Sequence, residues 1–222
     1  MIHYDRSLRA LAVLLAMLAG FVDAIGFLKL GGMFVSFMSG NSTRLAVGIA
    51  TGSEAALLAA MLIAAFVAGV VAGSLLSAFA SHRRKPAVLI VVALMLAAAA
   101  ILSDWQFDGV ALPVMAFAMG CANMVFQRDG EVSVGVTYMT GALVKIGQRI
   151  GAALLGGDRL GWLPYLLLWL GLVAGGVIGA LTYAHVAMDG LWAASAAALI
   201  LAALAHRATG RQAVGERRSR PR

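Results

Sequence analysis

The chain has 222 residues, of which 62% are hydrophobic and 12% are charged, and its formal net charge is +7. Soluble domains are about 45–50% apolar and about 25% charged, so this composition excludes a soluble protein and predicts an integral membrane protein. The basic residues gather at the two termini and at residues 82–85, without the basic, aromatic groove of a nucleic-acid binder. We therefore expect the lipid bilayer as a partner and no nucleic acid.

Eight apolar stretches follow one another along the chain, and their length and Ala/Leu content predict helices rather than strands. A membrane span needs roughly 20 residues, so about six to eight spans use the whole length. We expect the first stretch to be a retained span, because it is too long for a signal peptide and carries Asp23 late. The stretches cover residues 8–28, 33–52, 55–80, 86–103, 110–127, 132–155, 161–186 and 189–206.

Two polar pentapeptides interrupt the apolar sequence and resemble each other. Segments 37–41 (FMSGN) and 138–142 (YMTGA) lie 101 residues apart, and a basic residue, Arg44 or Lys145, follows each glycine four positions later. At nearly the same offset, Asp23 matches Asn123, and the GxxxG pair at 69 and 73 matches the pair at 171 and 175. We therefore predict two related halves, residues 1–106 and 107–206, and a basic, disordered cytoplasmic tail at 207–222.

The distribution of charge favours six spans over eight. With eight spans, the basic residues 83–85 would lie on the side opposite the N-terminus, against the positive-inside rule. If 33–52 and 132–155 are instead broken or re-entrant, the basic residues share the side of both termini. We predict an all-α polytopic transmembrane bundle of about six spans, with both termini cytoplasmic. Three crossings in each half make the repeat inverted, as in secondary transporters whose sites lie between the halves.

The polar residues at membrane depth are the candidates for function. A glycine among hydroxyl and amide groups permits unwinding and a ligand or ion contact, but the same residues also serve tight helix packing. Asp23 lies inside the first stretch, where an ionised carboxylate costs about 2.5–3.5 kcal/mol, and we expect it to pair with Arg44. It is either a proton-coupling or cation-binding group or a structural partner. The candidate substrate or ion pathway comprises Asp23, Ser39, Gly40, Asn41, Arg44, Asn123, Thr140, Gly141 and Lys145.

Lys145 has a second interpretation, because Gln148 and Arg149 lie on the same helical face. The three side chains either line an aqueous vestibule or reach lipid headgroups. No catalytic arrangement is visible. A single intramembrane carboxylate does not make an aspartyl protease, and no GxSxG motif occurs. The four histidines lack metal-ligand spacing, and one cysteine forms no internal disulfide. We expect no enzyme, no cofactor and no metal.

Residues 20–24, 27–35 and 38–41 form the longest motif of the first half. In these residues the chain resembles the YoaK family of bacterial multi-pass membrane proteins, which is defined by a domain of unknown function. Where the family has Gln and Ala on either side of Asn123, this chain has Ala122 and Met124. The resemblance implies six spans in an inner membrane and no established substrate. The second-half motif is matched by Gly120, Asn123, Thr137, Thr140 and Gly141.

Two functions follow from these observations. The first is a small-solute transporter or channel with a site at the interface of the two halves, its solute unknown. The alternative is a non-transporting membrane scaffold that assembles through its glycine-rich faces, including as a homo-oligomer. Because Asn41 is replaced by Ala142 and Asp23 by Asn123, we expect the first half to hold the chemistry.

Overall fold

The structure is a computed structural model that describes residues 6–80, 83–128, 131–132 and 135–219. The predicted all-α class is confirmed, with one two-residue hairpin, β1 (Gln127–Arg128) and β2 (Glu131–Val132), that the sequence did not predict. Two 3-10 turns, η2 (Asn123–Phe126) and η3 (Ala187–Asp189), adjoin the helices. The helices are α1 (Arg6–Lys29), α2 (Met38–Thr51), α3 (Ala55–Ala80), α4 (Arg84–Asp104), α5 (Asp108–Ala122), α6 (Met139–Leu154), α7 (Leu163–Val186) and α8 (Gly190–Ser219).

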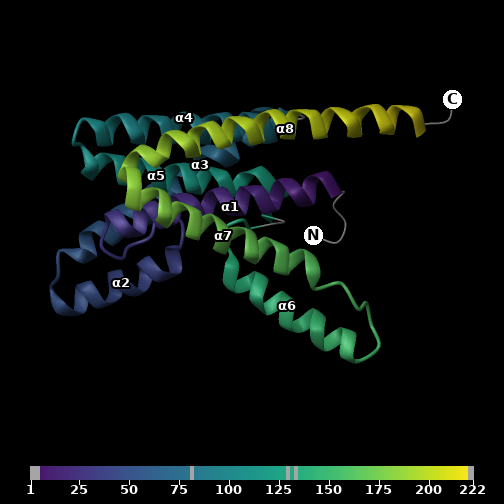
Figure 1. Cartoon of the computed structure of the whole chain (residues 1–222), viewed down its shortest axis with the longest axis horizontal. Coiled ribbons are helices and arrows are strands. Elements are labelled where there is room, and N and C mark those ends of the chain that lie inside the picture. The colour runs from purple at the N-terminus through teal and green to yellow at the C-terminus, as the bar shows by residue number, and fades with distance from the viewer. Residues whose placement is uncertain (1–5, 81–82, 129–130, 133–134, 220–222) are drawn as a thin grey trace.

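Five helical segments of the described chain are long and apolar enough to cross a membrane. The last segment, Leu163–Ala208, contains both α7 and α8. These two helices run in opposite directions on either side of Ala187, whose φ of 47° breaks the helix (Figure 1). Helices α2 and α6 have 14 and 16 residues, fewer than the roughly 20 that a span requires. The predicted polytopic transmembrane bundle is therefore confirmed.

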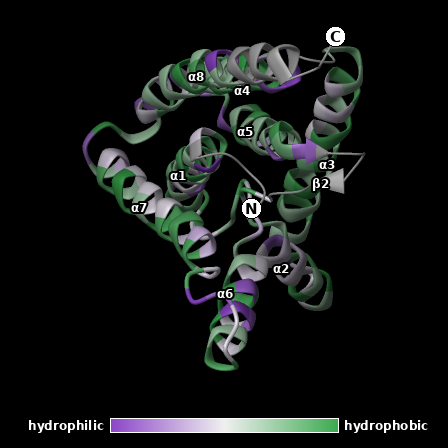
Figure 2. Cartoon of the chain, turned by 90° about the vertical axis from the view of Figure 1, so that its right-hand side faces the viewer, coloured by the Kyte–Doolittle hydropathy of each residue, from purple (hydrophilic) through white to green (hydrophobic). Residues whose placement is uncertain are grey.

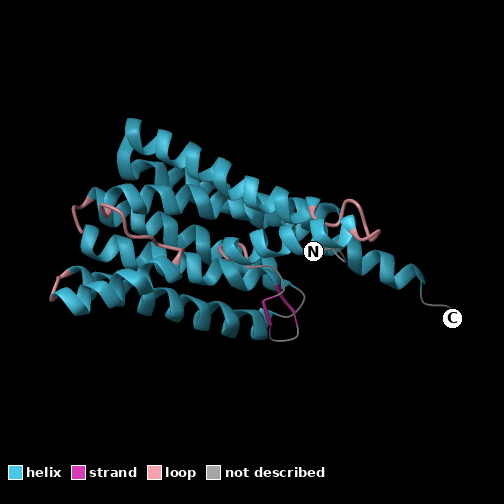
Figure 3. Cartoon of the chain, turned by 90° about the horizontal axis from the view of Figure 1, so that it is seen from below, coloured by secondary structure: helices cyan, strands magenta, loops and turns pink. Residues whose placement is uncertain are grey.

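The long helices are arranged in pairs around a central pair. The view along the helices places α1 and α5 in the middle, with α3 and α7 on either side of them (Figure 2). Helices α4 and α8 pack together along one edge, where the Ser195 hydroxyl donates a 2.8 Å hydrogen bond to the Ala93 carbonyl. The two short helices, α2 and α6, lie along the opposite edge. Most of the loops gather at the two ends of the bundle (Figure 3).

Glycines bring the central helices into backbone contact with their neighbours. Gly20 of α1 lies against the main chain of Leu172 in α7, and Gly120 of α5 lies against the main chain of Phe66 in α3. A Cβ atom at either glycine would collide with a carbonyl group. Small residues allow helices to approach this closely, and membrane proteins use them where hydrophobic collapse does not drive association. These contacts make α1–α7 and α3–α5 two of the main interfaces of the bundle.

Charged residues occupy opposite ends of the bundle. Both chain termini lie at one end, where α4 also begins with Arg84 (Figure 1). At the other end, Lys29 and Asp108 form a 2.6 Å ion pair that joins the end of α1 to the start of α5. Helix α8 continues to Ser219, through most of the segment for which we expected a tail; residues 220–222 of that segment lie outside the described residues. The boundaries of the halves and tail stay a prediction.

Candidate functional site

The two pentapeptides enter their short helices through the same backbone turn. Phe37 has φ −88° and ψ 76°, and Tyr138 has φ −86° and ψ 61°, the values of an inverse γ-turn. In each turn the following methionine donates its amide hydrogen two residues back, to Ser36 in one case and Thr137 in the other, at 3.1 Å. The sequence likeness of the segments is therefore also a likeness of local structure.

The ends of the short helices match as well. Gly52 after α2 and Gly156 after α6 have φ values of 65° and 89°, a conformation that favours glycine. The residue after each glycine donates its amide hydrogen to a carbonyl five residues earlier, at 2.9 Å. This pattern closes both helices as a Schellman motif does.

Asp23 holds the chain where it returns toward the bundle after α1. Its Oδ1 atom accepts the amide hydrogens of Val35 and Ser36, both at 2.8 Å. The expected ion pair with Arg44 is wrong. Arg44 is exposed on α2 and its guanidinium lies beside Gly32. The carboxylate instead accepts hydrogen bonds from backbone donors that have no helical partners in this nonhelical segment, as buried N–H groups require.

Asp23 is half-buried and also faces open space. It lines a groove of about 460 Å³ between α1, Phe34 and α7, where Leu172 and Gly176 form the other wall. One side of the carboxylate is thus bound to backbone, while the side chain borders a space that a small ligand can enter. Asp23 is the acidic side chain in a groove lined otherwise by glycine and apolar residues.

Asn41 binds the same returning segment from the other side. Its Oδ1 atom accepts the Phe34 amide hydrogen at 3.0 Å, and its Nδ2 atom donates to the Phe34 carbonyl at 2.6 Å. The Asn41 side chain is fully buried. The Phe34 ring packs on Phe27 and Phe37, with centroids 4.9 and 5.2 Å away. A Cβ at Gly40 would lie 2.6 Å from the Phe37 ring, so Gly40 makes room for this aromatic cluster.

In the described residues, the second half binds its returning segment differently. Asn123 accepts a 3.2 Å hydrogen bond from the Thr137 hydroxyl and donates to the Met119 carbonyl at 3.0 Å. Ala142, at the position of Asn41, is buried and has no side-chain amide to bind the backbone. Gly141 faces open space, in contrast to Gly40. These differences agree with the expectation that the halves are unequal.

The remaining candidates lie on the outer faces of the short helices. Ser39 on α2 and Thr140 on α6 are exposed. Lys145 places its ammonium 5.4 Å from the ring centroid of Tyr165 on α7, within the range of a cation–π contact. Lys145 therefore helps to dock α6 on α7, a role that neither earlier interpretation included.

The structure brings some of the candidates together and separates the others. Asp23, Gly40 and Asn41 surround segment 34–36, and Asn123 meets Thr137. Helix α2 packs on α3 and α6 packs on α7, and in the described part of the chain α2 and α6 share no extended interface. Among the residues that the structure describes, no group of three His, Cys, Asp or Glu side chains could hold a metal ion.

Sequence reasoning missed the partners of the candidate residues. The amides of Val35 and Ser36 and the backbone of Phe34 form half of the site, but backbone groups have no signature in the sequence. Gly31 and Gly32 were the available signal, since two glycines after an apolar helix indicate that the chain turns there. Such a turn leaves amides that a nearby polar side chain must bind.

Comparisons with known proteins agree with this architecture. The family model described as "Protein of unknown function (DUF1275)" matches residues 11–204. A protein of Rhizobium meliloti (strain 1021), described as "UPF0700 transmembrane protein RA0705", is 40% identical over 196 residues, which cover 88% of this chain and 85% of that protein. No solved structure matches the chain. Together with the apolar helices, these similarities support a location in a membrane.

Proposed function

This chain belongs to the DUF1275 family, which includes the YoaK proteins it resembles, and on that premise we propose that it carries a small solute across the membrane. The observation behind the proposal is Asp23, a carboxylate within an apolar span that holds a broken segment and borders a groove. Ionisable residues within spans are costly, and they commonly mark ion or substrate pathways. Asp23 would bind the coupling ion, proton or solute.

We place the pathway between two inverted halves. The contacts of the central glycines support this repeat, because Gly20 meets α7 as Gly120 meets α3, and Gly175 meets Met17 as Gly69 meets Phe117. The two offsets differ. Gly20 of α1 corresponds to a residue 100 positions later in α5, whereas Gly69 of α3 corresponds to a residue 106 positions later in α7.

The repeat offset therefore changes along the chain. Gly69 and Gly73 of α3 correspond to the glycines at 175 and 179 of α7, one helical turn beyond the pairing that the sequence suggested. The connection between α6 and α7, residues 155–162, is longer than the connection between α2 and α3, residues 52–54. The additional residues in that loop account for the larger offset.

The directions of the short helices support the same arrangement. Helices α2 and α6 both begin in the interior of the structure and run toward opposite ends (Figure 1). Broken helices whose N-termini approach the membrane interior from opposite sides form the sites of several transporter folds. An aquaporin-like channel uses similar half-helices.

Asp23→Asn tests the transport proposal. Asparagine keeps an Oδ1 acceptor for Val35 and Ser36, and the second half already uses asparagine at this position, so the fold should persist. Reconstituted into liposomes with a panel of metabolites and ions, the variant should lower flux of the transported solute by about tenfold or more, the effect of one charged contact. Asp108→Asn, at the end of the bundle, is the matched control.

Two outcomes would contradict the proposal. Equal flux through the wild type and Asp23→Asn for every transported solute would remove Asp23 from the mechanism. Flux at the level of protein-free liposomes for every solute, from a wild type that is correctly folded, would instead support the scaffold function.

We further propose a bacterial inner-membrane location with both termini in the cytoplasm. An impermeant thiol reagent applied from outside should label Gln106→Cys and leave Arg83→Cys unlabelled, because these exposed positions lie at opposite ends of the bundle. Cys121 is buried, so the wild type serves as the unlabelled control. Labelling of Arg83→Cys alone would reverse the orientation.

One observation favours the alternative, a non-transporting scaffold. In the described chain, the polar candidates of the two halves line no common groove among three that lie at the helix interfaces, and those three grooves are almost entirely apolar in lining. Such a protein would act by binding other membrane proteins or copies of itself. We propose no enzymatic activity, cofactor or nucleic-acid partner for either function.

A further inference from the structure

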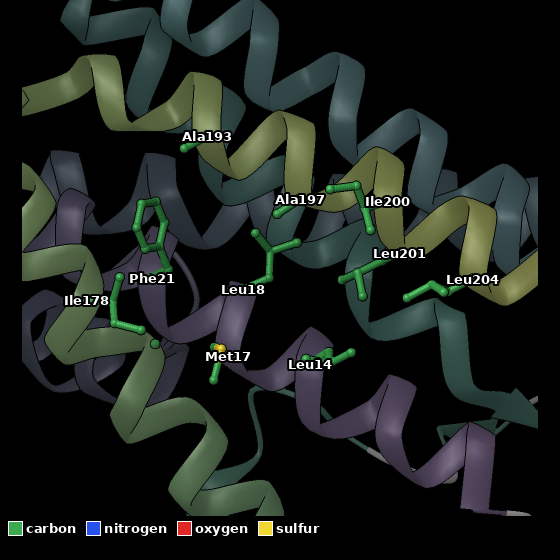
Figure 4. A pocket seen from close by; sticks show the side chains of 11 residues that line it. Leu14, Met17, Leu18, Phe21, Ile178, Ala193, Ala197, Ile200, Leu201 and Leu204 are labelled. Carbon is green, nitrogen blue, oxygen red and sulfur yellow. The ribbon is translucent and has the colours of Figure 1, made fainter.

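An apolar groove opens between α1, α7 and α8. It has a volume of about 340 Å³, and Figure 4 shows its side chains reaching into the space between the three helices. Gly175 and Ala197 are among its lining residues, and neither carries a side chain larger than a methyl group. Ile178 and Ile200 on its rim are 48% and 61% exposed, so the described residues leave this face uncovered.

A second groove continues toward the end of the bundle that contains the termini. It has a volume of about 480 Å³ and lies between α1 and the start of α7, lined by Val13, Leu163 and Leu167. Leu14 lines both grooves, so the two spaces meet at this residue. Each volume is within the range of ligand sites, about 300–1,000 Å³.

Arg9 is the charged residue in these grooves. It lines the second groove among apolar side chains. Its Nε atom is buried and has no hydrogen-bond partner among the described residues. A cationic group among apolar side chains is costly unless an anion meets it, and guanidinium groups bind phosphate through two parallel hydrogen bonds.

We propose that these two grooves bind one anionic phospholipid, with its phosphate at Arg9 and its acyl chains along α1, α7 and α8. The charge of Arg9 is complementary to the phosphate, and the apolar lining beyond it suits hydrocarbon. A free phosphate ion would use Arg9 and leave the grooves empty, so the shape favours a lipid. Arg9 lies near the start of α1, at the level where headgroups meet a span that begins at Arg6.

Native mass spectrometry of the detergent-solubilised protein tests this proposal. The wild type should retain phosphatidylglycerol in preference to phosphatidylethanolamine, which is neutral overall. Arg9→Gln should weaken phosphatidylglycerol binding by about tenfold or more, since it removes a charged hydrogen bond. Arg9→Lys keeps the charge and should preserve most of the preference.

Two further variants locate the lipid. Ala197→Leu places a larger side chain in the groove and should reduce binding of both lipids. Arg83→Gln removes a positive charge from an exposed residue at the same end of the bundle and should leave binding unchanged. A thermal melt of each variant separates loss of lipid from loss of fold.

Three results would overturn the proposal. The first is a wild type without headgroup preference, which would make Arg9 one of many residues that reach the headgroup layer. The second is an equal loss of phosphatidylglycerol in Arg9→Gln and Arg83→Gln, which would indicate attraction by net charge. The third is inorganic phosphate competing fully with the lipid, which would assign the site to the ion alone.

Discussion

Replacing Gly175 by alanine should destabilise the protein by about 3 kcal/mol, at the upper end of the cost of overpacking. The new Cβ would collide with the carbonyl group of Met17 in α1. Main-chain atoms do not rotate away as the end of a side chain does, so α1 and α7 must move apart. Because α1 lies at the centre of the bundle, this separation would loosen its other interfaces. Thermal unfolding in detergent, followed by size-exclusion chromatography, measures the loss.

The matched control is Gly147→Ala in α6. Gly147 is exposed and a Cβ there meets nothing within 4 Å. Alanine favours helix over glycine by about 1 kcal/mol, so this variant should be as stable as the wild type or slightly more so. Gly69→Ala, whose Cβ would collide with the Phe117 carbonyl in α3–α5, should behave like Gly175→Ala. Equal stability of Gly175→Ala and Gly147→Ala would show that the two helices are not in backbone contact.

Asn41→Ala should have the second largest effect. It removes the two hydrogen bonds to the backbone of Phe34 and leaves a partly buried donor and acceptor without the partner they had. Leaving a buried polar group unsatisfied costs about 1–3 kcal/mol for each group. The loss should increase the mobility of segment 33–37 and loosen the packing of the Phe34 ring on Phe27 and Phe37. It should also lower the thermal unfolding temperature in detergent.

Asn41→Asp and Ser39→Ala complete this experiment. Aspartate keeps the acceptor for the Phe34 amide, but it loses the donor to the carbonyl and places a carboxylate in a fully buried site. Burying an unpaired charge is costly, so Asn41→Asp should be no more stable than Asn41→Ala. Ser39 lies two residues before Asn41 on the same helix and is exposed, so Ser39→Ala should leave the stability unchanged. An Asn41→Ala protein as stable as Ser39→Ala would mean that the Phe34 backbone does not depend on this side chain.

The helices themselves were accessible from the sequence because helical hydrogen bonds are local. The predicted stretches 55–80 and 161–186 agree closely with α3 and α7. Stretch 33–52 was too long, since α2 begins only at Met38. Residues 33–37 are as apolar as a helix, but Asp23 and Asn41 bind backbone groups of this segment, and it does not form a helix. A hydropathy pattern contains no information about that competition.

The second half shows the same limit. Stretch 132–155 was predicted as one segment, yet α6 begins at Met139 and a short hairpin pairs Gln127 with Val132. A two-residue strand is stable only because its partner is adjacent, and no periodicity of 2 can develop over such a length. The segment between them contains Thr137, whose hydroxyl bond to Asn123 holds the start of α6.

The sequence was sufficient to find the polar candidate residues, but the binding partner predicted for Asp23 was wrong. Asp23 was expected to bind Arg44 because opposite charges attract, and Arg44 is the nearest cation in the adjacent motif. Backbone amides compete equally well for a carboxylate, and two of them lie 2.8 Å from it. Arg9 was not among the candidate residues, because an arginine near the start of a span is common. Its place in a groove depends on residues of α7, which are far away in the sequence.

The sequence by itself determined that the chain is a helical membrane protein and where polar residues interrupt its spans. These properties depend on the hydrophobicity of each residue and on hydrogen bonds between residues close in sequence. Only the tertiary structure decided that Asp23 and Asn41 bind the returning backbone and that Arg9 lines an apolar groove. It also decided that the contact of Gly69 with α5 corresponds to the contact of Gly175 with α1, although Gly171 lies against α1 as well. Each of these depends on the distance between segments far apart in the chain, which composition and periodicity do not encode.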